Sequence, residues 1–129
     1  MTDAGVEHAT GAVERWNRVF EAVSAEPRRQ LVVSLLDASA DRSVSLPESA
    51  INPNVPPDPT TLRYELVHCH LPMLADMGFI QWRTEPFVAS RGERFGEVAA
   101  VFEALHDDAD ALPDSLVVGC QRLERERRS

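Results

Sequence analysis

The chain has 129 residues, a formal net charge of −8 and 43% hydrophobic residues. This length suits one domain, and the hydrophobic content excludes a wholly disordered chain. No run approaches the ~18 consecutive apolar residues of a membrane-spanning helix, and the acidic N-terminus carries no basic-then-apolar signal peptide. Two cysteines, Cys69 and Cys120, form neither a disulfide scaffold nor a CxxC zinc clip. We therefore expect a cytoplasmic, single-domain protein that does not enter a membrane.

All 13 basic residues are arginine, and the 21 acidic residues are spread along the whole chain. Net negative charge ordinarily argues against nucleic-acid binding. However, an acidic surface without lysine is also similar to that of proteins from salt-loving archaea. At ~1 M salt the Debye length is only about 3 Å, so repulsion within such a surface is largely screened. The sequence therefore predicts a halophilic protein, for which net charge says little about partners.

The N-terminal quarter of the chain predicts two helices. Residues 1–12 lack a strong periodic pattern, and we expect them to be flexible. A helical stripe follows at spacings of 3, 4 and 3, and it consists of Val13, Trp16, Phe20 and Val23. Pro27 suits the first turn of a second helix, which we expect to continue to about Ala38.

The next segment predicts a long helix after a short strand and a loop. Val44 is expected to pair in a very short strand, and Ser45-Leu46-Pro47-Glu48 resembles a capping box that opens a short helix. Four prolines make residues 52–59 a rigid loop. Asp58 and Pro59 are typical of a helix start, and Gly78 of a helix end. The long helix from Pro59 to Met77 should bury one side, which consists of Leu62, Leu66 or Val67, Leu71 and Leu74.

A β-hairpin and two helices complete the predicted order. Residues 79–83 and 87–89 have the aromatic and β-branched content of strands. Ser90-Arg91-Gly92-Glu93 resembles a second capping box, and the helix after it should bury one stripe of residues. That stripe consists of Phe95, Val98, Phe102 and Leu105. After an acidic loop, one last helix should begin near Asp114.

This order predicts a mainly α fold with a small β-hairpin. A hairpin that follows the third helix of a compact helical group is the order of a winged helix-turn-helix, here with extra N-terminal and C-terminal helices. We expect residues 1–12 to be a flexible N-terminus. Residues 13–129 should form a single winged-helix domain with a C-terminal helical extension.

Two segments resemble a known family. The stretch HLPMLADMGFI (70–80) is similar to the H-L-x-x-L-x-x-x-G-[FLI]-[IV] pattern of ArsR-like winged-helix regulators. Together with EPRRQLVVSLL (26–36), the HCHLPML stretch (68–74) is also similar to uncharacterised winged-helix domains of halophilic archaea, whose hallmark is H-x-H-L-P-x-L. The resemblance covers roughly residues 15–90 and implies that the long helix enters the major groove of DNA. It departs at the proline-rich loop and at Pro72, which should kink the helix.

A helix that reads DNA needs an outward face of donors, with basic groups beside it for phosphates. The residues that we expect to contact DNA are Thr61, Arg63, Tyr64, His68, Arg83 and Arg91. Arg63 suits a bidentate contact with guanine, Thr61 and Tyr64 suit phosphates, and the other two arginines lie at the ends of the hairpin. The alternative is an ordinary solvated face, which the acidic Glu65, Asp76 and Glu85 favour because each repels a phosphate.

His68-Cys69-His70 raises the question of a metal site. Consecutive residues of a helix are about 100° apart, so the two histidines should point in nearly opposite directions and cannot chelate one ion. We therefore predict no metal and no cofactor, with Cys69 as a small core residue and His70 as a partly buried hydrogen-bonding one. The sequence also lacks a phosphate-binding glycine loop, an H-E-x-x-H motif and a nucleophile elbow, so we expect no catalytic residues and no enzyme.

The helices at the two ends of the chain carry apolar stripes that something must cover. Packing on the same domain is one alternative, and a two-fold homodimer is the other. The expected dimer residues are Val13, Trp16, Phe20, Leu116, Cys120 and Leu123. The sequence thus favours a dimeric winged-helix protein that binds double-stranded DNA and regulates transcription. The alternative is a winged-helix module for protein–protein contact without affinity for DNA.

Overall fold

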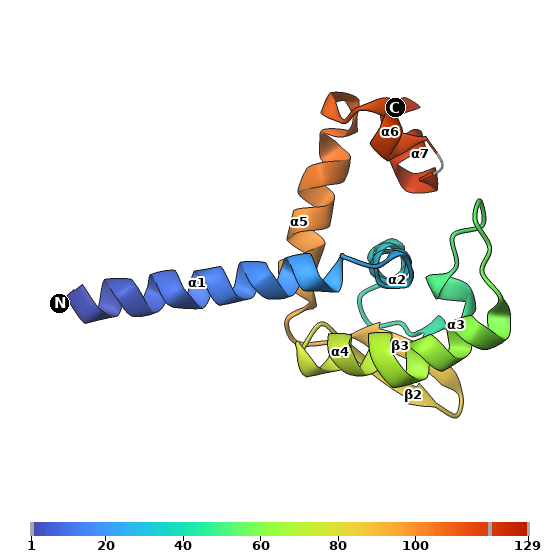
Figure 1. Cartoon of the computed structure of the whole chain (residues 1–129), viewed down its shortest axis with the longest axis horizontal. Helices are drawn as coiled ribbons and strands as arrows, with labels where there is room; N and C mark the ends of the chain where they lie inside the picture. The colour runs from blue at the N-terminus through green and yellow to red at the C-terminus, as the bar shows by residue number, and fades with distance from the viewer. Residues whose placement is uncertain (1, 119, 129) are drawn as a thin grey trace.

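The structure is a computed structural model that describes residues 2–118 and 120–128, and it is mainly helical with one small antiparallel sheet (Figure 1). The α-helices are α1 (Thr2–Ala22), α2 (Glu26–Asp37), α3 (Pro59–Glu65), α4 (Leu71–Asp76), α5 (Phe95–Asp107), α6 (Asp114–Val117) and α7 (Gln121–Arg128). The strands are β1 (Val44–Ser45), β2 (Ile80–Thr84) and β3 (Phe87–Arg91). Short helical turns are η1 (Glu48–Ala50) and η3 (Ala109–Ala111), both 3-10, and η2 (Leu66–His70), which is a π-helix. The predicted class, mainly α with a small hairpin, is confirmed.

The sheet has the strand order β1-β3-β2, and both pairs are antiparallel. The middle strand β3 places Ala89 opposite both Val44 of β1 and Trp82 of β2. The very short strand predicted at Val44 is therefore confirmed. Since neighbouring residues of a strand face opposite sides of the sheet, Trp82 and Thr84 share one face while Arg83 points to the other.

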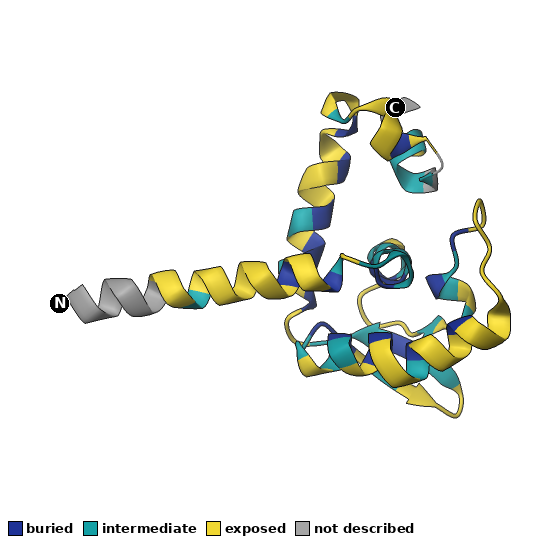
Figure 2. Ribbon diagram, in the orientation of Figure 1, coloured by how far each residue is buried: buried dark blue, intermediate teal, exposed yellow. Residues whose placement is uncertain are grey.

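The core lies where α2, the long helix α3–η2–α4, α5 and the sheet meet (Figure 2). Its largest side chains with at most 2% exposure are Leu31, Val32, Leu35, Leu62, Leu66, Leu71, Leu74, Phe79, Phe95 and Val98. Leu62, Leu71 and Leu74, which were predicted to face inward from the long helix, are among them. Of the two alternatives Leu66 and Val67, Leu66 is the buried one. Pro27 stands in the first turn of α2 as expected.

The ends of the long helix follow local chemistry. Asp58 caps the first turn, because its carboxylate accepts a hydrogen bond from the backbone N–H of Thr61. Gly78 follows the helix with a φ of 82°, a conformation that favours glycine. Gly92 closes the opposite side of this junction, where an added Cβ would lie 2.5 Å from the carbonyl oxygen of Gly78.

Helix α1 begins at Thr2, well before the predicted Val13, and extends away from the rest of the molecule (Figure 1). Only its last turns contact the core, where Val19 and Ala22 are buried. In residues 2–118 and 120–128, no helix combines the length and the apolar character needed to cross a membrane.

Several local predictions are wrong because the residues concerned make tertiary contacts instead. Both proposed capping boxes fail, since Ser45 belongs to β1 and Ser90 to β3. The helix predicted from Asp114 is divided into α6 and α7. Leu105 is 47% exposed, whereas His106 is buried with its Nδ1 2.7 Å from the carbonyl oxygen of Phe102.

Candidate nucleic-acid interface

Three of the predicted site residues lie together on the outward face of the long helix. Because its leucines point into the core, the opposite side of the long helix faces solvent. Tyr64 is 66% exposed, and Arg63 and His68 are also exposed. The ring centroids of Tyr64 and His68 are 4.3 Å apart, so the two aromatic side chains contact each other along the helix.

Arg63 links this face to the hairpin. Its guanidinium lies over the ring of Phe87 on β3, 4.3 Å from the ring centroid. A shallow hollow of about 370 Å³ lies beside it between the helix and the end of β2. The residues that line this hollow are Thr60, Arg63, Tyr64, Val67, His68 and Thr84. The structure therefore brings three of the predicted DNA contacts together, and it adds Thr60 and Thr84 to them.

The other three predicted contacts lie elsewhere or are engaged in other contacts. Thr61 donates its hydroxyl to the carboxylate of Asp58 at 2.8 Å, so it belongs to the helix cap. This hydrogen bond and the one from the backbone N–H of Thr61 lower the pKa of Asp58. Arg83 is exposed on β2, but it extends from the sheet face opposite to Thr84.

Arg91 has an internal role that the sequence did not reveal. Its guanidinium donates to the carbonyl oxygens of Leu35 and Ala38, at 2.8 and 3.1 Å, and it also lies over the ring of Phe95. A cation at the C-terminus of a helix satisfies carbonyls that have no partner within the helix and opposes the helix dipole. Arg91 therefore holds the end of α2 on the sheet, and we leave it out of the interface.

The π-helix η2 determines which histidine faces solvent. The N–H of Leu71 donates to the carbonyl of Leu66, five residues before it, and Pro72 has no N–H to donate. His68 is exposed while His70 is buried, so the two histidines do face opposite sides, as predicted. Cys69 is exposed, so its predicted place in the core is wrong.

A buried pair, Arg28 and His70, joins α2 to the long helix. Arg28 is 5% exposed and lies 2.7 Å from Nδ1 of His70, which must accept because arginine only donates. The proton of the imidazole is then on Nε2, which faces the carboxylate of Glu65 at 3.9 Å. Burial, followed by the charge of Arg28, lowers the pKa of His70, and Glu65 acts in the opposite direction.

The same arginine closes the end of α1. Its guanidinium also donates to the carbonyl oxygens of Glu21 and Ala22 and to the hydroxyl of Ser24. Arg28 was not predicted, because one of two adjacent arginines in a helix gives no sequence signal of burial. Arg28 positions the long helix by contacting His70 on its buried side, and it does not contact the outward face.

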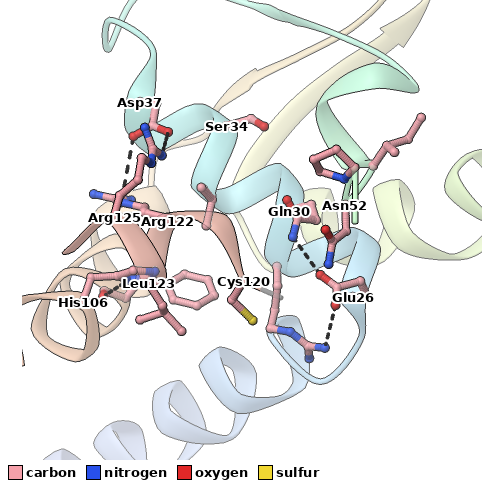
Figure 3. A pocket seen from close by; sticks show the side chains of 15 residues that line it. Glu26, Gln30, Ser34, Asp37, Asn52, His106, Cys120, Arg122, Leu123 and Arg125 are labelled. Carbon is pink, nitrogen blue, oxygen red and sulfur yellow. Dashed lines mark hydrogen bonds and ion pairs between the residues drawn. The ribbon is translucent and has the colours of Figure 1, made fainter. Parts of the chain in front are cut away.

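A second hollow, of about 230 Å³, lies between α2, α5 and α7 (Figure 3). At one edge Asp37 pairs with Arg122 and Arg125, at 3.9 and 3.7 Å. Cys120 lines the hollow, and burial together with the nearby carboxylate of Glu26 raises the pKa of its thiol. A raised pKa disfavours the thiolate, which is the reactive form of cysteine.

The predicted dimer residues fall into two groups. Val13, Trp16 and Phe20 of α1 are all more than half exposed. In the C-terminal stripe, by contrast, Cys120 and Leu123 line the hollow of Figure 3, whereas Leu116 is 58% exposed. Within the described ranges, no three histidine, cysteine or acidic side chains come close enough to hold a metal ion.

No known family model matches the chain, and no curated protein or solved structure is significantly similar to it. The resemblance to ArsR-like regulators therefore remains a prediction from the residues quoted for it.

Proposed function

We propose that this chain is a winged-helix, homodimeric DNA-binding protein that regulates transcription in a high-salt cytoplasm. The observation that carries the proposal is the order α2, β1, η1, long helix, β2, β3, combined with the strand order β1-β3-β2. In a winged helix-turn-helix the long helix enters the major groove and the hairpin touches the backbone beside it. Here these roles fall to the helix from Pro59 to Asp76 and to β2–β3.

The side chains on the outward face suit these two kinds of contact. Arg63 presents a planar guanidinium that Phe87 holds between helix and hairpin, which favours a bidentate contact with guanine. Tyr64 and His68 supply further donors along the same face. Arg83 would contact a phosphate from the hairpin.

One set of observations favours the alternative, a protein–protein module. Glu65, Asp76 and Glu85 are exposed around the same helix and hairpin, and the whole chain carries a net charge of −8. The element that precedes the long helix is only the 3-10 turn η1, and eight loop residues, 51–58, separate η1 from the long helix. These features reduce the number of contacts that the protein can make with DNA phosphates. A protein partner would not require such contacts.

Fluorescence anisotropy tests the proposal with the duplex upstream of the protein's own gene and a scrambled duplex, across a KCl series. Wild type should prefer the upstream duplex. Arg63→Ala should lower this preference by about 1–3 kcal/mol, whereas Arg83→Ala should weaken both duplexes about equally. Arg18→Ala on α1 removes the same charge far from the interface and should leave binding unchanged. If wild type shows no preference at any salt concentration, the protein–protein module replaces the regulator.

A further inference from the structure

Helix α1 presents an apolar surface that its own chain leaves open. With 21 residues it spans about 31 Å at 1.5 Å per residue, yet only its C-terminal turns touch the body. The contacts there are made by the buried Val19 and Ala22 and by an ion pair of 2.9 Å between Arg15 and Glu97. A helix gains most of its stability from the tertiary packing of one face, and residues 9–18 of α1 are largely without such packing.

The exposed residues have the spacing of a coiled-coil seam. Ala9, Val13, Trp16 and Phe20 are separated by 4, 3 and 4 positions, the a/d pattern of a heptad. Val13, Trp16 and Phe20 are 58%, 52% and 60% exposed. The rings of Trp16 and Phe20 stack at 5.7 Å between centroids, which makes one continuous apolar surface.

The residues beside this seam carry no charge. The flanking e and g positions in the exposed part of the helix are Thr10, Ala12 and Asn17. Glu14, Arg18 and Glu21 lie on outer positions of the heptad. A chain with a net charge of −8 can therefore approach another copy of itself through this seam without placing like charges opposite each other. An uncharged rim also offers no charge pattern that would select an acidic or a basic partner.

We propose that α1 pairs with α1 of a second copy of this chain in an antiparallel two-stranded coiled coil. The volumes along the seam favour this direction. In an antiparallel register Phe20 packs against the partner's Ala9, and Trp16 packs against the partner's Val13. A parallel pair in register would instead place tryptophan on tryptophan and alanine on alanine, which overfills one layer and leaves a void in another.

The size of the seam sets the expected strength. Two half-exposed aromatic side chains provide on the order of 200 Å² per copy, from a typical 150–250 Å² each. The valine, the alanine and the groove between α1 and α5 at Ala12 and Val101 add to this area. The total stays near or below the roughly 1,200 Å² of a standard stable interface, so the dimer is reversible.

Sedimentation equilibrium in multimolar KCl tests the pairing, at concentrations from about 1 to about 300 µM around an expected micromolar Kd. Wild type should pass from monomer to dimer within this range. Phe20→Glu, and Phe20→Ala in case the charge disturbs folding, should shift the midpoint at least tenfold upward. Val55→Glu changes a valine that is 69% exposed in the proline-rich loop, and it should leave the midpoint unchanged. A wild type that is monomeric throughout, or a Phe20→Ala variant with an unchanged midpoint, would overturn the pairing.

Disulfide trapping tests the direction in a background of Cys69→Ser and Cys120→Ser. Ala9→Cys combined with Phe20→Cys in one chain should form cross-linked dimers under mild oxidation, because each new thiol faces the other position of the partner. Neither substitution alone should cross-link. Efficient cross-linking by Ala9→Cys alone would show a parallel pair and contradict the proposed direction.

Discussion

Helix α1 and the long helix α3–η2–α4 are both amphipathic, but they differ in whether the apolar side is buried. The long helix buries Leu62, Leu66, Leu71 and Leu74 to 2% exposure or less, and it leaves a polar face in solvent. In α1 the apolar side itself is exposed, at Val13, Trp16 and Phe20. A helical stripe in a sequence therefore shows that a surface needs cover, but not whether the same chain supplies it. The long helix directs polar groups outward, and α1 directs apolar ones.

The largest effect is expected where the two helices are joined. Arg28→Ala removes a buried guanidinium that satisfies two carbonyls at the end of α1 and Nδ1 of His70. Breaking a buried charged network of this kind costs about 3–5 kcal/mol of unfolding free energy. Urea denaturation would measure the loss, with Arg42→Ala as the control, because Arg42 is exposed in a turn and surface changes stay within about ±0.5 kcal/mol. A loss for Arg28→Ala as small as that of the control would mean that this network does not hold the helices together.

A matched pair of substitutions separates the two apolar surfaces. Leu66→Ala opens a cavity in the core and should cost about 2–5 kcal/mol at any protein concentration. Phe20→Ala should cost at most about 0.5 kcal/mol in dilute, monomeric protein, because its ring is already mostly in solvent. At high concentration its cost should rise, since the dimer stabilises the wild type by mass action. Equal costs at both concentrations would contradict the comparison.

A smaller effect is expected from pH, and two histidines of the same helix provide the contrast. Burial and Arg28 hold the pKa of His70 below its ordinary value near 6.5, and Glu65 only partly compensates. The unfolded chain therefore binds this proton more readily than the folded chain. Stability from His70 is complete above about pH 6.5 and declines as the pH falls toward the lowered pKa.

Denaturation from pH 7.5 down to about pH 5 would check this dependence. His70→Gln should flatten the pH profile relative to wild type. His68→Gln alters the exposed histidine and should leave the profile as it is in wild type. A wild-type profile that is already flat would show that protonation of His70 is not linked to folding.

The sequence predicted what local chemistry controls. Asp58, Pro59 and Gly78 give the limits of the long helix, and its leucine spacing gives the buried side, because each depends only on near neighbours. Arg63, Tyr64 and His68 were correctly expected to lie on or near the opposite face for the same reason.

Most of the remaining errors arose from contacts between distant segments. The serines of the expected capping boxes pair in the sheet, and Arg91 binds carbonyls at the end of α2. Cys69 faces solvent because the π-turn changes the angular position of the residues around it. The buried place of Arg28 depends on three segments that meet only in the folded chain. None of these features leaves a periodic signal in the sequence.

We propose that the polar face of the long helix binds DNA and that the apolar face of α1 binds a second copy. NMR chemical-shift mapping on ¹⁵N-labelled protein tests both proposals at once. On addition of the upstream duplex, shifts are expected for residues 60–68 and 83–88 and none for 9–20. On dilution without DNA, shifts are expected for residues 9–20 alone. Shifts that are absent from residues 60–68 with DNA, or that appear on α1 instead, would contradict these proposals.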